Sequence, residues 1–480
     1  MSDLKKSIIK GTVWSVFGHM ASLLIILVTN IWLARLLTPK EFGQAGVIMF
    51  FITLANVFTE SGLGGALVRK KNATKADYST VFVTNLIFSV FCFVIIFLSA
   101  EFVAEYYNDV SLKNLLVVAG VMIFINAFQL TQNARLISEM KFKQKAIYRF
   151  IAVVFSSIIG IYFAYQGIGV WAIILIQLLT AFINTLLLWV FEGFYLKLCF
   201  SKSSFKELYA FGMNTTLSSL LNTGFDNVYQ LVFAKHFSLL QTGYYYQAKK
   251  LQDIPGGIII MITQSVIFSS LANLQDNKQA FAKVYNKITL YSLVMLGFIS
   301  TFIYVYAEPI VLLLYGKNWV GAIFYMQLLT IASFFYLQEQ ISRVIFKVFD
   351  QTRQILYLEY LKKSIQALSI GIGMYYLDIK ILVIGFVVTN IIGYFINYYF
   401  SRRIISLVTY DEIFTLLKVV TLSVLSVFLV MQLSVSLQLD QYMVFLTIPI
   451  LFLFYFIGLY AFNVMNISKE LKVLFNYTNK

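Results

Sequence analysis

The chain has 480 residues, of which 60% are hydrophobic, 17% are aromatic and only 12% are charged, and its mean hydropathy is +0.80. A water-soluble fold of this length cannot bury so much apolar surface, so a lipid bilayer is the solvent that fits. The net charge of +15 comes from short basic clusters between apolar runs. This pattern is typical of cytoplasmic membrane loops and excludes nucleic acid as the expected partner.

Long apolar runs recur along the whole chain, and strand-like alternation is absent. Because a helix needs roughly 20 mostly apolar residues to cross the hydrocarbon, the runs predict about fourteen transmembrane helices. The predicted spans are residues 11–36, 43–66, 78–103, 112–132, 146–165, 168–193, 207–236, 243–272, 284–308, 319–346, 354–377, 379–401, 412–434 and 441–464. The predicted fold class is an all-α integral membrane protein.

The distribution of positive charge predicts the orientation. Most Lys and Arg fall into alternate loops, among them Lys70, Lys71, Lys75, Arg135, Lys141, Lys143, Lys145, Arg149, Lys197, Arg402, Arg403, Lys469, Lys472 and Lys480. The positive-inside rule then places both termini in the cytoplasm of a multi-pass protein of the cell (inner) membrane. The start of the chain leads into a long span, so no cleavable signal peptide is expected.

Few residues suit metal, redox or hydrolytic chemistry. Cys92 lies in an apolar run and Cys199 in a basic loop, so a disulfide is not expected. His19 and His236 are far apart and have no Cys or acidic cluster beside them, which predicts neither a metal site nor a catalytic triad. No Gly-rich phosphate loop occurs, so we expect no cofactor and no direct use of ATP.

The first half of the chain weakly resembles the second half. Three matched segments carry the likeness: Leu33-Ala34-Arg35 with Thr38 and Gly43 matches Phe233-Ala234-Lys235 with Ser238 and Gly243, Arg135-Leu136-Ile137 matches Arg343-Val344-Ile345, and Phe182-Ile183-Asn184 matches Phe395-Ile396-Asn397. Each copy holds an even number of spans, so both have the same orientation. They are then related by a pseudo-twofold along the membrane normal, with a cavity between them.

This duplication predicts the domain organisation. Residues 1–200 and 201–405 form two pseudo-symmetric six-helix lobes, and residues 406–480 add two transmembrane helices and a cytoplasmic tail. Two lobes around a cavity are typical of a transporter, which is not an enzyme.

Two lysines fall deep in the predicted span 243–272. Lys249 and Lys250 lie about two turns from its outer end, and Asp253 lies one turn deeper. A charge at bilayer depth costs about 2.5–3.5 kcal/mol, so such residues usually line a cavity. Two interpretations stay open: the lysines bind an anionic headgroup, or they extend to the outer interface with Asp253 as a partner.

Other charged residues in the spans are further candidates. Asp226, Glu60 and Asp253 could each bind a coupling proton or Na⁺, or pair with a neighbouring base. Arg35 and Lys235 are related by the repeat and flank the predicted outer mouth of the cavity. They could contact substrate there or extend to the interface.

The sequence Asp253-Ile254-Pro255-Gly256-Gly257 interrupts the helical pattern of the same span. Pro255 removes a backbone hydrogen bond, and Gly256 and Gly257 relax the packing around it. We therefore predict a kink or hinge at these three residues.

The remaining polar residues favour structural roles. Glu339 with Arg343, and Glu359 with Lys363, are four residues apart and predict ion pairs on helix faces. Scattered amides could contact sugar hydroxyls or hydrogen-bond between helices: Asn85, Asn126, Asn214, Asn222 and Gln264.

Three segments resemble a known family. They are Leu36-Leu37-Thr38-Pro39-Lys40-Glu41-Phe42-Gly43, Glu60-Ser61-Gly62-Leu63-Gly64-Gly65-Ala66-Leu67-Val68 and Gly243-Tyr244-Tyr245-Tyr246-Gln247-Ala248. With the six-plus-six-plus-two layout, they resemble the polysaccharide-transport (Wzx-type) flippases of the multidrug/oligosaccharidyl-lipid/polysaccharide exporter superfamily. The resemblance covers essentially the whole chain, although the first span lacks the mid-membrane arginine of the related lipid II flippases.

The resemblance implies a flippase that moves an undecaprenyl-diphosphate-linked oligosaccharide to the outer face of the membrane. It serves O-antigen, capsule or exopolysaccharide synthesis and works by alternating access around a cationic central cavity. Its partners are then the lipid-linked oligosaccharide, membrane lipid, and a polysaccharide polymerase or glycosyltransferases.

Two other functions were weighed against this one. A multidrug cation antiporter of the same superfamily usually has twelve spans and acidic cavity residues, unlike the fourteen predicted spans and deep lysines here. A membrane glycan polymerase or ligase is expected to carry a large outer loop with Arg or His, and no predicted outer loop is long enough.

Overall fold

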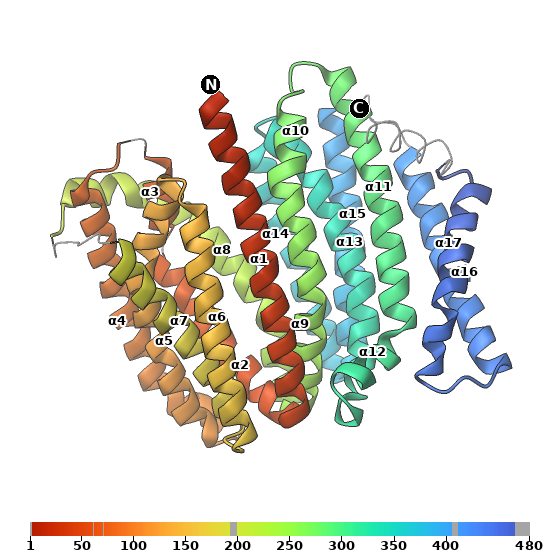
Figure 1. Cartoon of the computed structure of the whole chain (residues 1–480), viewed down its shortest axis with the longest axis horizontal. Coiled ribbons are helices and arrows are strands. Elements are labelled where there is room, and N and C mark those ends of the chain that lie inside the picture. The colour runs from red at the N-terminus through yellow and green to blue at the C-terminus, as the bar shows by residue number, and fades with distance from the viewer. Residues whose placement is uncertain (1, 61, 71, 193–198, 406–410, 466–480) are drawn as a thin grey trace. The chain divides into compact units, whose positions relative to one another are not determined.

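The protein is described by a computed structural model that covers residues 2–60, 62–70, 72–192, 199–405 and 411–465. Within these ranges all of the regular secondary structure is helical (Figure 1), which confirms the predicted all-α fold class. Helices satisfy their own backbone hydrogen bonds, as the membrane interior requires. Five residues of the predicted cytoplasmic clusters lie outside the described ranges: Lys71, Lys197, Lys469, Lys472 and Lys480.

The chain forms two compact units, Met1–Gln247 (unit 1) and Ala248–Lys480 (unit 2). Unit 1 contains α1 Ser2–Leu36, α2 Pro39–Glu60, α3 Leu63–Arg69, α4 Lys75–Tyr106, α5 Ser111–Ser138, α6 Phe142–Tyr165, α7 Val170–Glu192, α8 Lys202–His236 and the start of α9 Leu239–Ile262. Unit 2 contains the rest of α9, η1 Thr263–Ile267, α10 Phe268–Ala272, α11 Lys278–Val305, α12 Ala307–Leu314, η2 Lys317–Trp319, α13 Ala322–Val348, α14 Thr352–Tyr376, α15 Ile379–Ile404, α16 Asp411–Ser436, η3 Met443–Thr447 and α17 Ile448–Ala461.

The packing within each unit explains where the units divide. In unit 1, α8 packs against α2, α3 and α4, so it groups with the first six predicted spans. In unit 2, α13 packs against α15 and α11, and α11 packs against α16. The predicted lobe boundaries at residues 200 and 405 describe the sequence repeat and stay a prediction.

Ten helical segments in the described part of the chain are long and apolar enough to cross a membrane. They are Phe17–Leu36, Pro39–Glu60, Lys75–Tyr106, Ser111–Ser138, Phe142–Tyr165, Val170–Glu192, Lys278–Val305, Ile379–Ile404, Asp411–Ser436 and Met443–Ala461. The helices α8, α9, α13 and α14 match the remaining predicted spans, so the count of fourteen stays a prediction.

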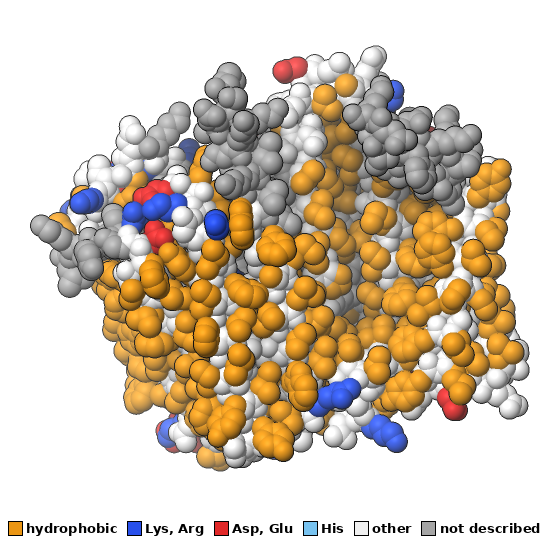
Figure 2. Space-filling view, viewed as in Figure 1, with side chains coloured by type: hydrophobic (Ala, Val, Ile, Leu, Met, Phe, Trp, Pro, Cys, Tyr) orange, Lys and Arg blue, Asp and Glu red, His pale blue; other side chains and the backbone are white. Residues whose placement is uncertain are grey.

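The outer faces of these helices are apolar. Phe97, Leu98 and Phe102 of α4 are 57%, 73% and 68% exposed. Figure 2 shows hydrophobic side chains covering the visible helices, with the visible Lys, Arg, Asp and Glu mostly near the upper and lower edges. Since water would penalise such a surface and lipid does not, the chain is a multi-pass membrane protein.

Two predicted spans differ in detail from the observed helices. The predicted span 43–66 is wrong as a single helix, because Gly62 has a φ of 63° and separates α2 from α3. Only glycine adopts that left-handed conformation at little cost. The predicted span 243–272 is helical throughout: α9 continues past Pro255 to Ile262, and a π-helical turn follows. The hinge at Pro255, Gly256 and Gly257 stays a prediction.

The starts of α2 and α9 are built alike. The Glu41 backbone N–H donates to Thr38 Oγ1 (3.4 Å), and the Gln241 backbone N–H donates to Ser238 Oγ (3.1 Å). Thr38 and Ser238 therefore serve as equivalent N-caps. These two residues are a pair that the repeat relates, so the likeness in sequence is matched by a likeness in structure.

The two helix starts touch at a glycine pair. A Cβ atom at Gly43 would lie 1.8 Å from the Leu239 carbonyl oxygen, and one at Gly243 would lie 1.7 Å from the Pro39 carbonyl oxygen. Each contact is the counterpart of the other under the repeat. Glycine is thus required at both positions, since any Cβ would overlap backbone. Both contacts lie within unit 1, and the pseudo-twofold that relates the two lobes stays a prediction.

Candidate functional site

A polar cavity lies inside unit 1, among α2, α3, α5, α6 and α7. Its larger part has a volume of about 670 Å³ and its smaller part about 230 Å³. Both parts are lined by the same five polar residues: Asn56, Asn126, Gln129, Arg149 and Asn184. Polar groups at membrane depth are costly unless they line a hydrated cavity, so this is the candidate functional site of unit 1.

Four amide side chains form a hydrogen-bonded chain along the cavity. Asn126 Nδ2 donates to Asn56 Oδ1 (3.1 Å), Gln129 Nε2 donates to Asn126 Oδ1, and Asn184 Nδ2 donates to Gln129 Oε1. The chain joins α2, α5 and α7. Each amide keeps donor or acceptor capacity for a ligand, because an amide group can form about four hydrogen bonds.

Two cations and one carboxylate line the larger part of the cavity. Lys145 and Arg149 are four residues apart on α6 and therefore lie on one helix face, and Glu60 is the last residue of α2. The Lys145 ammonium attracts the Glu60 carboxylate without forming a direct ion pair with it in the described structure. The cavity therefore carries one positive charge in excess and suits an anionic group.

The short helix α3 forms one wall of the cavity through Gly64, Gly65 and Val68. Its end is held by Lys70, whose Nζ donates to Glu207 Oε2 (2.9 Å) and to Asp77 Oδ1 (3.1 Å). The hydrogen bond to Glu207 is the main cause that raises the pKa of Lys70 above its ordinary value, and the bond to Asp77 adds to it, whereas burial acts in the opposite direction. The contribution of this pair to stability is therefore retained through neutral pH and lost only as the pH rises through the raised pKa.

The lysines predicted to bind an anionic headgroup lie on α9. Lys249 and Lys250 are both half-buried in unit 2, and Asp253 on the same helix is exposed. These three residues do not belong to the cavity of unit 1. Their role in substrate binding or ion coupling stays a prediction.

The other predicted site residues are spread over unit 1. Glu60 lines the cavity, while Asp226 is exposed on α8. Arg35 is exposed at the opposite end of α2 from Glu60, about 30 Å away by the length of that helix. Lys235 Nζ donates to the Tyr106 carbonyl oxygen (2.7 Å) at the end of α4 and lies 3.9 Å from the Tyr106 ring centroid. Lys235 thus caps a helix end, as cations often do.

Sequence reasoning missed Lys145 and Arg149 as cavity residues. It counted both with the basic residues of a cytoplasmic loop because they follow Lys141 and Lys143 in one basic run, although Arg149 also falls at the start of the predicted span 146–165. The structure places both inside α6, within the apolar segment Phe142–Tyr165. Their spacing of four residues at the start of an apolar helix was the available signal, because it puts two charges on one face.

Unit 2 holds a buried charged cluster among α13, α14 and α15. Glu339 is fully buried and accepts hydrogen bonds from Lys362 Nζ (2.6 Å) and Asn397 Nδ2 (3.2 Å). A Cβ atom at Gly393 would lie 2.9 Å from Lys362 Cε, so this glycine leaves room for the lysine stem. The carboxylate is thus fully paired inside the unit.

One of the two ion pairs predicted in this region is confirmed by the structure. Glu339 and Arg343 lie 3.9 Å apart, which confirms their pairing. Glu359 contacts Arg343 across the α13 and α14 interface. The pairing of Glu359 with Lys363 stays a prediction.

Replacing Lys362 with Met should destabilise the protein by about 3–5 kcal/mol, because Glu339 would keep a buried charge with too few partners. The midpoint of thermal unfolding of the purified protein in detergent measures the loss. The double variant Lys362→Met with Glu339→Gln should recover most of it, since no charge is left unpaired. Equal losses in the single and double variants would contradict this account.

Solved transporter structures share this fold. The chain is similar to the lipid II flippase MurJ in an inward closed conformation, with a TM-score of 0.72 and 15% identity over 93% of this chain and 98% of that chain. It is also similar to an inward-facing multidrug resistance MATE family transporter of the MOP superfamily, with a TM-score of 0.60 and 17% identity over 80% of this chain and 95% of that chain. The chain therefore shares the fold of these two transporters.

Residues 32–324 match the model of the family described as polysaccharide biosynthesis protein. The chain belongs to this family, which confirms the predicted family resemblance.

Curated relatives are named as transport or biosynthesis proteins. The succinoglycan biosynthesis transport protein ExoT of Rhizobium meliloti (strain 1021) is 22% identical over 66% of this chain and 64% of that protein, slightly less than two thirds of its length. The teichuronic acid biosynthesis protein TuaB of Bacillus subtilis (strain 168) is 23% identical over 69% of each chain. The lipopolysaccharide biosynthesis protein WzxC of Escherichia coli (strain K12) is 21% identical over 68% of this chain and 67% of that protein.

Proposed function

We propose that this protein is a flippase. It moves an undecaprenyl-diphosphate-linked oligosaccharide from the cytoplasmic to the outer face of the cell membrane, for the synthesis of a surface polysaccharide. Membership of the polysaccharide biosynthesis family and the transporter fold support this proposal. The relatives named as transport or biosynthesis proteins of succinoglycan, teichuronic acid and lipopolysaccharide support it further.

The observation that carries the proposal is the cationic, amide-lined cavity of unit 1. A diphosphate and a glycan cannot cross hydrocarbon unaided, because both would lose their hydration. Lys145 and Arg149 offer two cations for phosphate oxygens, and Asn56, Asn126 and Asn184 offer amides for hydroxyls. The polyprenyl tail can stay in lipid throughout.

Transport needs a direction and a conformational cycle. We propose alternating access of two lobes, with Lys249 and Lys250 as further cations on the substrate path and a hinge near Pro255. Moving a diphosphate outward is favoured by an inside-negative potential, by about 2.3 kcal/mol per charge per 100 mV. A coupling proton or Na⁺ at Glu60, Asp226 or Asp253 is therefore not required for export.

A multidrug antiporter is the second candidate, because the MATE transporter shares the fold. The charge of the cavity argues against it. Two cations and one carboxylate repel a cationic drug, whereas an antiporter of such drugs needs an acidic site.

A strain that lacks this gene should accumulate lipid-linked oligosaccharide in the inner leaflet and lose surface glycan. Radiolabelled lipid extracts measure the accumulation, and an impermeant glycan-binding probe on right-side-out and inverted vesicles reports the leaflet. A plasmid copy of the gene should restore both. Normal surface glycan together with altered drug sensitivity would favour the antiporter.

A further inference from the structure

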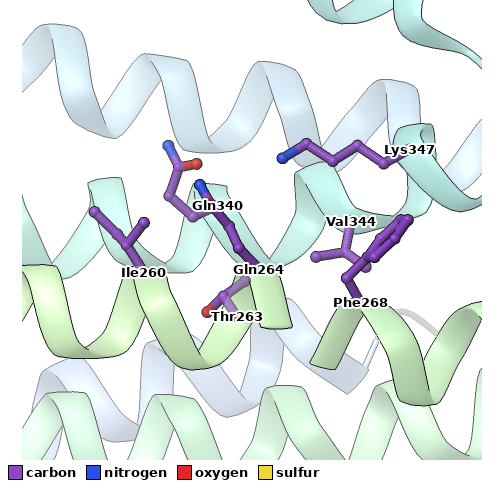
Figure 3. Close-up of a pocket in the computed structure, with 7 residues that line it drawn as sticks. All are labelled: Ile260, Thr263, Gln264, Phe268, Gln340, Val344 and Lys347. Carbon is purple, nitrogen blue, oxygen red and sulfur yellow. The ribbon is translucent and has the colours of Figure 1, made fainter. Parts of the chain in front are cut away.

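A second pocket lies within unit 2, between the segment 260–268 and α13. It has a volume of about 270 Å³. Its lining residues are shown in Figure 3: Ile260, Thr263, Gln264, Phe268, Gln340, Val344 and Lys347. None of them belongs to the cavity of unit 1 or to the Glu339 cluster.

The π-helical turn η1 shapes one wall of this pocket. Ile260, Gln264 and Phe268 are spaced four residues apart, and such positions drift around a regular helix of 3.6 residues per turn. The wider turn at Thr263–Ile267 counters that drift, because its hydrogen bonds run from i to i+5. An apolar side chain, an amide and an aromatic ring therefore face α13 together (Figure 3).

The wall formed by α13 carries the charged residue of the pocket, Lys347. Gln340, Val344 and Lys347 lie on one face of α13. Figure 3 shows the Lys347 side chain lying lengthwise along the helix, with its ammonium turned toward Gln340. A lysine that only sought the membrane surface would extend past the nearby end of α13 at Val348 instead.

Three of the four polar side chains that line the pocket form no hydrogen bond within the described part of the chain. In the described part of the chain, no hydrogen bond involves the side chains of Gln264, Gln340 or Lys347, whereas Thr263 Oγ1 donates to the Ile259 carbonyl oxygen (2.8 Å). Lys347 feels the like charge of Arg343 one turn earlier on α13. The pocket thus presents one ammonium, two amides and one aromatic ring to a ligand.

We propose that this pocket binds an acidic sugar residue of the cargo, with its carboxylate on Lys347 and its hydroxyl groups on Gln264 and Gln340. The inference rests on the proposed function. An amide both donates and accepts, as a sugar hydroxyl does, whereas an ionised phosphate only accepts and would leave the amide oxygens unpaired. The Phe268 ring and the apolar Ile260 and Val344 suit the C–H face of a pyranose ring.

Transport of two matched carriers tests this assignment. The full-length protein in proteoliposomes is given two synthetic polyprenyl-diphosphate disaccharides that differ only in the terminal residue, glucuronate or glucose. A charge-assisted hydrogen bond predicts that the wild type moves the acidic carrier roughly tenfold faster. Lys347→Met should remove this preference and leave the rate of the neutral carrier unchanged. Lys347→Arg should keep the preference, and Lys283→Met, on an exposed lysine of α11, should behave like the wild type.

Binding of methyl glucuronide and methyl glucoside, measured by ligand-observed NMR on the same preparations, separates this inference from the proposed function. Glucuronide binding that is lost in Lys347→Met supports the pocket even when neither carrier is transported, and that outcome would reject the flippase alone. Equal loss of both carriers in Lys347→Met would assign the lysine to the diphosphate and overturn the acidic-sugar site. Equal binding of both glycosides by wild type and variant would overturn it as well.

Discussion

Export of lipid-linked glycan should fall by roughly 100-fold when Lys145 and Arg149 are both replaced with Met. Each cation is expected to contribute about 1.5–3 kcal/mol to holding an anionic headgroup in the cavity, as hydrogen bonds to charged groups do. The rate of translocation in proteoliposomes measures the loss directly. Each single variant should lose roughly tenfold or more, because one cation remains.

Lys143 provides the matched control for this prediction. It lies on the same helix, is exposed, and its Nζ sits 4.9 Å from the Trp14 ring centroid, outside the cavity lining. Lys143→Met removes the same charge and should leave export unchanged. Equal losses in Lys143→Met and Lys145→Met would mean that only the overall charge of α6 matters, and the cavity would lose its proposed role.

Replacing Gly43 with Ala should destabilise the protein strongly and abolish export. The new Cβ atom would lie 1.8 Å from the Leu239 carbonyl oxygen, so the backbones of α2 and α9 would have to separate. Overpacking of this kind costs about 1–3 kcal/mol and more against a rigid backbone. Gly243→Ala should have the same effect, because its Cβ meets the Pro39 carbonyl oxygen in the reciprocal way. The thermal unfolding midpoint and the translocation rate measure both effects.

Gly46 supplies the control on the same helix. A Cβ atom there would lie 3.4 Å from the Tyr246 ring, which is close to an ordinary contact, so Gly46→Ala should be tolerated. The double variant Gly43→Ala with Gly243→Ala should be less damaging than the sum of the two single variants, since separating the helices once relieves both overlaps. Strict additivity would show that the two glycines do not share one crossing.

Much of the site could not be predicted from the sequence because it depends on which face of a helix meets another helix. Lys249 and Lys250 stood out in the sequence as charges deep in a span; they lie half-buried on α9 in unit 2, and their role in binding stays a prediction. Lys145 and Arg149 belonged to a basic run at a helix start, where the sequence favoured a loop. Only the packing of α6 against α7 and α1 places them inside unit 1.

Glu60 was a candidate for ion coupling or for pairing with a base because a carboxylate in an apolar run is costly, and the structure shows that it lines the cavity. Asn126 was named as a residue that could contact sugar or hydrogen-bond between helices, but its chain of contacts with Asn56, Gln129 and Asn184 was not predicted, because those residues come from three different helices. The π-helical turn before Phe268 leaves no pattern in the sequence that differs from an ordinary helix. Its effect on the pocket of unit 2 appears only in three dimensions.

Composition and periodicity determined that the chain is an all-helical membrane protein, because the transfer of each apolar residue into lipid adds up along a span regardless of its neighbours. The family likeness also came from the sequence, since the matched segments at Gly43 and Gly243 are local. The tertiary structure decided which charges remain unpaired and face a cavity. A charge that is paired in the fold and one that faces a cavity cannot be told apart in the sequence. Lys362 has Glu339 as its partner, whereas Lys145 faces the cavity, and only the packing of the helices distinguishes them.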